Sequence, residues 1–202
     1  MKKTGIFGGL FDPVHIGHLN MAQCALEQAE LDSVIFVPNG NPPHKDGDCA
    51  DFEHRLNMLF AATADNPRFA VSDYERTTGE FHYTVDTMRH FRAENPGDEF
   101  FFILGADSLD YVNTWMRADE LIRENVFIAV NRNFRGGYSL EKNIAELESI
   151  GGRVTEVKMP MIDISSTLVR RAAAEGRDVR YLTGAAAAGY IKQNKLYMGE
   201  NR

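Results

Sequence analysis

Short hydrophobic runs that alternate with amphipathic stretches constrain the fold of this chain more than any other feature. Runs rich in β-branched or aromatic residues predict six strands, at residues 4–7, 33–37, 69–72, 100–104, 126–130 and 154–157. Helical patterns between and after them predict helices at residues 15–29, 52–64, 84–93, 118–124, 140–149, 166–174 and 185–193. This alternation predicts an α/β fold: a doubly wound, mostly parallel sheet that binds ligands at the carboxyl ends of its strands.

The size and charge of the chain limit its organisation and its partners. With 202 residues, of which 44% are hydrophobic, the chain can bury a real core. We expect one domain over residues 1–202, in which residues 164–202 form a C-terminal helical portion. The 22 basic and 29 acidic residues give a net charge of −7, which argues against nucleic acid or an anionic membrane as a partner. From Lys158 onward basic residues outnumber acidic ones, so phosphate contacts are expected there.

The cysteines and the N-terminus indicate the compartment. Cys24 and Cys49 form neither a metal-ligand spacing nor a disulfide framework, which suits a reducing environment. Glycines, Asp12 and Pro13 interrupt any hydrophobic segment near the N-terminus that could act as a signal peptide or membrane span. We therefore expect a cytoplasmic protein.

The strongest chemical signal is the segment 8–18, which reads Gly-Gly-Leu-Phe-Asp-Pro-Val-His-Ile-Gly-His. It follows the first predicted strand and opens the first helix, so glycine backbone and helix N–H groups can approach phosphate oxygens. His15 and His18 are three residues apart and project from the same side of the first turn. The alternative is a Gly-Pro turn capped by two histidines; the register of strand, turn, histidines and helix favours a polyphosphate cradle instead.

A second signal lies at residues 164–170, which read Ile-Ser-Ser-Thr-Leu-Val-Arg. Ser165 or Ser166 can cap a helix whose first N–H groups face an anion. Thr167 and Arg170 are three apart, so hydroxyl and guanidinium share one face and can bind phosphates together. Alone, this segment is typical of an ordinary capped surface helix, and its occurrence with the first signal favours phosphate binding.

Together these segments resemble those of a known family. His15-Ile16-Gly17-His18 is similar to the HxGH signature of the nucleotidyltransferase superfamily, and residues 164–170 are similar to the ISSTxxR motif of small adenylyltransferases. Pro42-Pro43-His44-Lys45 and the segment 83–87 resemble the PPHK and YTxDT segments of bacterial nicotinate-nucleotide adenylyltransferases. The chain departs from that pattern at His82, where serine is common, and at Gly184-Ala185, where Val-Pro is usual.

The resemblance implies an enzyme that transfers AMP from ATP to nicotinic acid mononucleotide in NAD biosynthesis. It implies catalytic roles for His15, His18 and Arg170. The ATP-binding residues that it implies are Gly8, Gly9, Phe11, His15, His18, Gly105, Asp107, Ser165, Ser166, Thr167 and Arg170. The acceptor-binding residues that it implies are Asn39, Lys45, Tyr83, Thr84 and Trp115. Taken alone, Lys45 would be a solvated loop charge and Trp115 a core residue.

The expected cofactor is Mg²⁺ bound mainly through the ATP phosphates, with no metal site built from protein side chains. The expected partners are the two small-molecule substrates, without nucleic acid or membrane, and a homo-oligomer is left open. Two alternatives remain: transfer to phosphopantetheine or another small acceptor, and a non-catalytic nucleotide sensor on the same fold.

Overall fold

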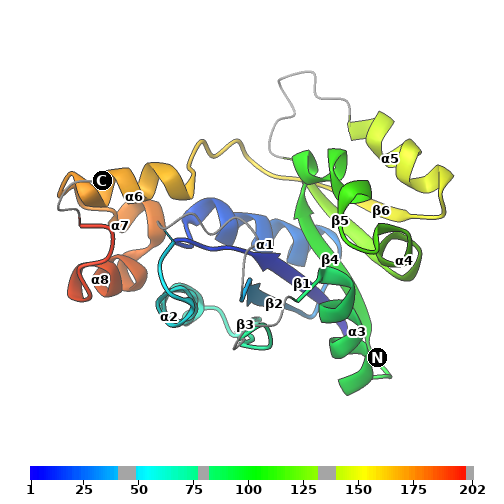
Figure 1. Ribbon diagram of the computed structural model, residues 1–202, viewed down its shortest axis with the longest axis horizontal. Helices are drawn as coiled ribbons and strands as arrows, with labels where there is room; N and C mark the ends of the chain where they lie inside the picture. The colour runs from blue at the N-terminus through cyan, green and yellow to red at the C-terminus, as the bar shows by residue number, and fades with distance from the viewer. Residues whose placement is uncertain (41–48, 77–81, 132–139, 199–202) are drawn as a thin grey trace. The chain divides into compact units, whose positions relative to one another are not determined.

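The computed structural model describes residues 1–40, 49–76, 82–131 and 140–198, which form strands and helices in alternation (Figure 1). The strands are β1 (Lys3–Gly9), β2 (Ser33–Pro38), β3 (Phe69–Val71), β4 (Glu99–Gly105), β5 (Val126–Asn131) and β6 (Arg153–Lys158). The helices are α1 (Ile16–Gln28), α2 (Phe52–Thr63), α3 (Thr84–Glu94), α4 (Ala118–Glu124), α5 (Leu140–Ser149), α6 (Ser166–Ala174), α7 (Arg180–Thr183) and α8 (Ala185–Gln193). Two short 3₁₀ turns, η1 (Ala106–Asp110) and η2 (Val112–Thr114), follow β4.

The sheet has the strand order β3-β2-β1-β4-β5-β6. The pairs β1/β4, β4/β5 and β5/β6 are parallel, with Phe7 opposite Ile103 and Ile103 opposite Ile128. The predicted doubly wound α/β fold is therefore confirmed. The order of the strands reverses between β1 and β4, and in such sheets ligands bind beyond the carboxyl ends of the strands at this switch.

The predicted elements all occur, and their bounds agree with the prediction to within two residues. The periodicity missed only the shortest elements, η1, η2 and α7. Three to five residues are too few to show a helical repeat in a sequence, so these turns could not be distinguished from loops.

The chain divides into two compact units. The first comprises residues 1–8, 21–35 and 82–162, and its core is formed by buried apolar residues of β1, β4 and β5 together with α3 and α4, such as Ile6, Met88, Ile103, Leu121 and Phe127. The second comprises residues 9–20, 36–81 and 163–202 and holds β3, α2, α6, α7 and α8. In this unit α8 packs against α2, with Ile191, Leu56 and Leu59 buried.

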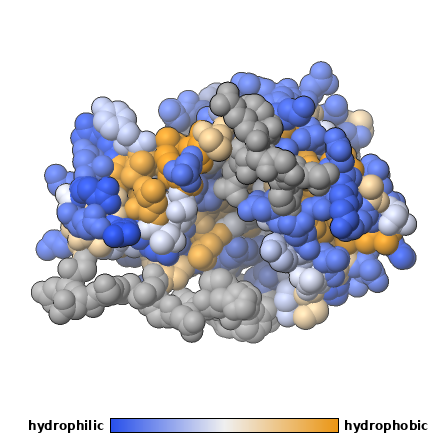
Figure 2. Space-filling model, turned by 90° about the horizontal axis from the view of Figure 1, so that it is seen from above, coloured by the Kyte–Doolittle hydropathy of each residue, from blue (hydrophilic) through white to orange (hydrophobic). Residues whose placement is uncertain are grey.

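The surface can be judged from one face and from the exposed side chains. Figure 2 shows one face, on which hydrophilic side chains predominate and hydrophobic ones gather over part of the surface. Large exposed hydrophobic side chains in the described residues include Tyr111, Met161 and Tyr181. Within the described ranges, none of the helices is long and apolar enough to span a membrane.

Candidate active site

The turn after β1 is built around a buried aromatic ring. Phe11 has a left-handed backbone (φ 51°) and is only 2% exposed. Its ring lies edge-on to His18, with centroids 5.1 Å apart, and to Phe36 at 5.8 Å. A Cβ atom at Gly9 would lie 3.0 Å from this ring, so a glycine is required there by close approach. The ring of Phe11 thus packs against His18 and helps to hold its position.

The two histidines stack on one another where α1 begins. His15, which precedes the helix, is 4% exposed, and its ring centroid lies 3.7 Å from that of His18 at an interplanar angle of 24°. The backbone N–H of His15 donates to Nδ1 of His18 at 3.2 Å. Since Nδ1 accepts, a neutral His18 carries its proton on Nε2, which is then a hydrogen-bond donor.

The start of α6 is joined to this turn by hydrogen bonds. Ser165 caps the helix, its Oγ accepting from the N–H of Leu168 at 3.2 Å. The Ser166 hydroxyl donates to the carbonyl of Pro13 at 2.9 Å, and Nη1 of Arg170 donates to the carbonyl of Asp12 at 2.7 Å.

The predicted shared face of Thr167 and Arg170 is also present. Nη2 of Arg170 lies 3.4 Å from Oγ1 of Thr167, to which it donates. The side chain of Arg170 is 31% exposed. The histidine turn and the second motif therefore form one cluster in the second unit, although about 150 residues separate them in the sequence.

Two further residues of this cluster were not found from the sequence. Arg55, in α2, is 1% exposed and donates to the carbonyls of Leu10, Asn39 and Ala50 at 2.9, 2.8 and 3.1 Å. Asp12 is 2% exposed and accepts from the N–H of Ala50 at 3.2 Å. The sequence signal that could have revealed the buried position of Arg55 is its place among the apolar residues of the same helix.

Of the predicted acceptor residues, Asn39 lies in this unit and its backbone N–H donates to the carbonyl of Gly9 at 2.9 Å. Its side chain donates to Glu75 at 3.3 Å. Lys45 and the rest of Pro42-Pro43-His44-Lys45 lie outside the described residues.

The remaining predicted site residues lie in the first unit. Gly8 is the last residue of β1 that belongs to this unit, Gly105 is the last residue of β4, and Asp107 is exposed in η1, directly after β4. Tyr83 precedes α3 with extended backbone, and Thr84 is the first residue of that helix. A helix start of this kind offers N–H groups and the positive end of a dipole to an anion.

Trp115 is not a fully buried core residue. It is half-buried after η2, and its edge-to-face contact with Phe102 has centroids 6.0 Å apart at 85°. Because Trp115 is only half-buried, part of its surface is exposed.

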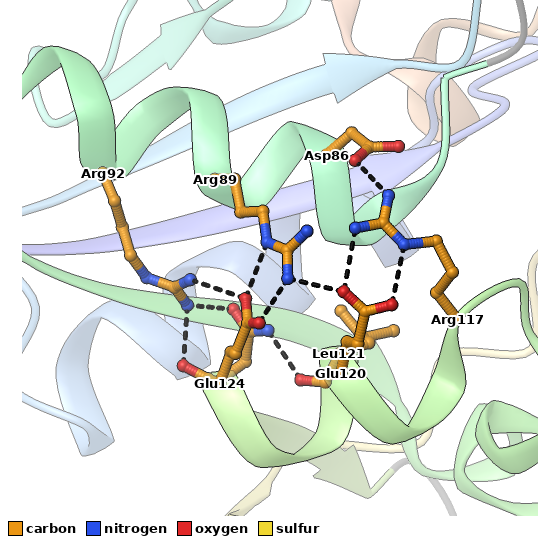
Figure 3. A network of polar contacts seen from close by, with 8 residues as sticks. Asp86, Arg89, Arg92, Arg117, Glu120, Leu121 and Glu124 are labelled. Atoms are coloured by element: carbon orange, nitrogen blue, oxygen red, sulfur yellow. Dashed lines mark hydrogen bonds and ion pairs between the residues drawn. The ribbon is translucent and has the colours of Figure 1, made fainter.

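A network of ion pairs joins α3 to α4 beside these residues (Figure 3). Arg117 donates to Asp86 at 2.6 Å and, through two nitrogens, to Glu120 at 3.0 and 2.9 Å. Arg89 donates to Glu120 at 2.6 Å and also binds Glu124. Hydrogen bonds from Arg117 and then Arg89 lower the pKa of Glu120 to about 2. Glu120 is therefore ionised at neutral pH, and the network fixes the chain two residues beyond Trp115 to the first turn of α3.

The described part of the chain contains no group of three or more His, Cys, Asp or Glu side chains arranged to hold a metal ion. In the turn after β1, Oδ1 of the Asp12 carboxylate accepts hydrogen bonds from the N–H of Ala50 and the hydroxyl of Tyr197. The donors of the turn, by contrast, suit phosphate oxygens.

Comparison with known proteins identifies the family of the chain. The family model described as cytidylyltransferase-like matches residues 6–172. A protein of Geobacillus thermodenitrificans named "Probable nicotinate-nucleotide adenylyltransferase" is 41% identical over 198 residues, covering 98% of this chain and 87% of the relative. A protein of the same name from Bacillus pumilus is 39% identical and covers 98% of this chain and 99% of the relative.

Solved structures show the same fold. The nicotinic acid mononucleotide adenylyltransferase of Plasmodium falciparum complexed with NaAD has a TM-score of 0.80 at 21% identity, covering 98% of each chain. The same enzyme complexed with APC gives a TM-score of 0.79 at 20% identity, again covering 98% of each chain.

The fold and the family model define a nucleotidyltransferase. The chain is about 40% identical, over almost its whole length, to proteins named nicotinate-nucleotide adenylyltransferases. The resemblance to this family that the sequence motifs indicated is therefore confirmed. The chain belongs to the nicotinate-nucleotide adenylyltransferase family, within the cytidylyltransferase-like proteins.

Proposed function

We propose that this enzyme transfers the AMP group of ATP to nicotinic acid mononucleotide, giving nicotinic acid adenine dinucleotide and pyrophosphate, a step of NAD biosynthesis. The observation that supports it most is the stacked pair of His15 and His18 at the start of α1, in which Nδ1 of His18 accepts from the backbone N–H of His15. Its small-molecule partners are then ATP and the mononucleotide. The cysteine content favours a cytoplasmic location.

The nucleophile is the phosphate of the acceptor. Because the second pKa of a phosphomonoester is about 6, this group is largely dianionic at neutral pH and needs no general base. One of its oxygens forms a bond to the α-phosphorus of ATP, and the bond from that phosphorus to the bridging oxygen breaks. The electron pair of that bond leaves with pyrophosphate.

The role of the protein is to hold the reacting groups and to stabilise charge. We assign Nε2 of His18 to the α-phosphate oxygens, on which charge develops in the transition state, and His15 to the polyphosphate. The stack on His15 and the edge contact with Phe11 restrict the His18 ring, so its donor is preorganised.

The second motif is assigned to the leaving pyrophosphate. The hydroxyl proton of Ser166 is used on Pro13, so the contribution of Ser166 to phosphate comes from its backbone N–H at the start of α6. Thr167 and the exposed part of Arg170 supply the side-chain donors. A guanidinium has five N–H donors, so Arg170 can bind the carbonyl of Asp12 and a phosphate together.

Mg²⁺ fits this donor set because it commonly keeps its waters and takes few protein ligands. Oδ1 of Asp12 already accepts two hydrogen bonds, and the metal would be held mainly by the phosphate oxygens of ATP, as Mg²⁺ commonly is. When bound, it would supply additional neutralisation of phosphate charge.

The acceptor is assigned to Tyr83, Thr84 and Trp115, with Asn39 and Lys45 as further contacts. The N–H groups at the start of α3 favour a carboxylate, and an amide would present its own donor to them. Leaving such donors without acceptors costs about 1 to 3 kcal/mol each, so we expect a preference of roughly ten- to a hundredfold for the acid.

The decisive experiment measures pyrophosphate release with ATP and either nicotinic acid mononucleotide or nicotinamide mononucleotide at pH 7.5 under identical magnesium. We expect higher kcat/KM for the acid and the same KM for ATP with both acceptors. Equal kcat/KM for both would exclude the carboxylate site and leave adenylyl transfer intact. If pyrophosphate were released with phosphopantetheine but with neither mononucleotide, nicotinic acid mononucleotide would be rejected as the acceptor.

A further inference from the structure

The carboxylate of Asp12 lies at the centre of contacts that the transfer mechanism does not use. Its Oδ1 accepts hydrogen bonds from the N–H of Ala50 at 3.2 Å and from the hydroxyl of Tyr197 at 2.6 Å. Its Oδ2 lies 3.8 Å from Nη1 of Arg170, the nitrogen that donates to the carbonyl of Asp12 at 2.7 Å. A carboxylate that is only 2% exposed is thus shared between a phosphate-binding arginine and the C-terminal segment.

The backbone after α8 fixes the position of Tyr197 beside Asp12. Helix α8 is anchored on α2 and ends in a Schellman turn, in which the N–H of Leu196 donates to the carbonyl of Ile191 at 3.0 Å. Lys195 and Tyr197 both have left-handed backbone, with φ of 52° and 60°. Bulky residues persist in that region only where their surroundings impose it. The segment is therefore held in a strained conformation that brings the hydroxyl of Tyr197 to Asp12.

We propose that Tyr197 is a positioning residue for adenylyl transfer, which fixes the guanidinium of Arg170 by holding the carboxylate of Asp12. The hydroxyl of Tyr197 and the N–H of Ala50 satisfy one oxygen of this carboxylate, so the guanidinium binds chiefly the backbone carbonyl and keeps donors for phosphate. Without the hydroxyl, the under-bonded carboxylate attracts Arg170 more strongly and withdraws it from the leaving group.

Tyr197 is suited to this role because it stays neutral. Burial, and then the negative charge of Asp12, raise the pKa of Tyr197 above its usual value. The phenol therefore remains a donor at any pH at which the enzyme would act. The proposal depends on the assignment of Arg170 to pyrophosphate, made above, and the experiment tests the two separately.

The test compares Tyr197→Phe with Tyr190→Phe. Both remove one phenolic hydroxyl from the same unit, but the hydroxyl of Tyr190 contacts Nδ1 of His54, at 3.1 Å, and is not bonded to Asp12. For Tyr197→Phe we expect kcat to fall about tenfold, the effect of one hydrogen bond to a charged group, and the KM for pyrophosphate in the reverse reaction to rise. The KM for nicotinic acid mononucleotide should not change, and Tyr190→Phe should leave all three constants unchanged.

A double variant separates positioning from stability. In an Arg170→Ala background, Tyr197→Phe should lower kcat by less than about twofold, because the residue through which it acts is gone. An equal fall in both backgrounds would overturn the proposal and show that Tyr197 only stabilises the fold. Normal kinetics for Tyr197→Phe, with strongly impaired Arg170→Ala, would overturn it while the assignment of Arg170 stands. Normal kinetics for Arg170→Ala would reject that assignment and the inference with it.

Discussion

Gly17, between the two histidines of the first motif, provides the sharpest test of how this turn works. A Cβ atom added at Gly17 would lie 2.9 Å from Nδ1 and 3.0 Å from Cε1 of His15. The ring of His15 cannot easily withdraw, because it is 4% exposed and stacked on His18. Replacing Gly17 with alanine should therefore displace His15 rather than be absorbed at the surface.

The size of the effect follows from this geometry. To reach the 3.4 Å at which ordinary contact begins, the ring of His15 must move by 0.5 Å. A misplacement of about 1 Å can cost a hundredfold in rate, so we expect kcat to fall about tenfold. Overpacking costs about 1 to 3 kcal/mol, which exceeds the gain of roughly 0.5 to 1 kcal/mol from replacing glycine in a helix. The free energy of unfolding should therefore fall by about 1 kcal/mol.

Gly189 provides the matched control. It lies in α8, and an added Cβ would meet nothing within 4 Å, so Gly189→Ala should raise stability by about 0.5 to 1 kcal/mol without changing kcat. Urea unfolding and pyrophosphate release would be measured on both variants. If Gly17→Ala were as active as the parent and gained stability as Gly189→Ala does, the glycine would be an ordinary helix residue and the packing argument would be wrong.

Three further substitutions test separate parts of the site. His18→Ala should lower kcat by roughly 100- to 1000-fold with little change in unfolding, since its donor meets charge that develops in the transition state; near-normal turnover would remove it from catalysis. Trp115→Ala should raise the KM of the acceptor by about two- to thirtyfold, which corresponds to the loss of the interaction between a pyridinium cation and the face of an indole ring, and should leave the KM of ATP unchanged. An equal rise in the KM of ATP would indicate that Trp115 has only a packing role. Arg55→Met should lower the free energy of unfolding by about 3 kcal/mol in urea titrations, since three carbonyls lose a buried charged donor; a loss below about 1 kcal/mol would contradict this.

Local signals in the sequence were sufficient to predict the strands and the longer helices, and to identify the two motifs at residues 8–18 and 164–170. Each strand and each long helix has its own hydrophobic repeat, which depends on neighbouring residues alone. The His15 and His18 pair could be predicted for the same reason, because strand, turn and helix start are contiguous. Ser165 could be predicted as a cap because its partner, the N–H of Leu168, lies three residues away.

The residues that hold the site together could not be predicted in this way. The partners of Arg55 lie up to 45 residues away in the sequence, and Tyr197 and Asp12 are 185 residues apart. No periodicity links such positions, and their roles depend on tertiary contacts between charged or hydroxyl groups and specific carbonyls. The backbone role of Asn39 also became apparent only from its bond to Gly9.

The contacts of α6 explain why the two motifs are needed together. A turn that binds an anion through N–H groups also carries carbonyl oxygens, and these would repel phosphate if they were left without donors. Here the carbonyls of Asp12 and Pro13 accept from Arg170 and Ser166, at 2.7 and 2.9 Å. The second motif therefore supplies donors to two carbonyl oxygens of the first. Since these bonds also fix the start of α6, the same two residues determine both where the N–H groups of its first turn lie and how negative the neighbouring turn is.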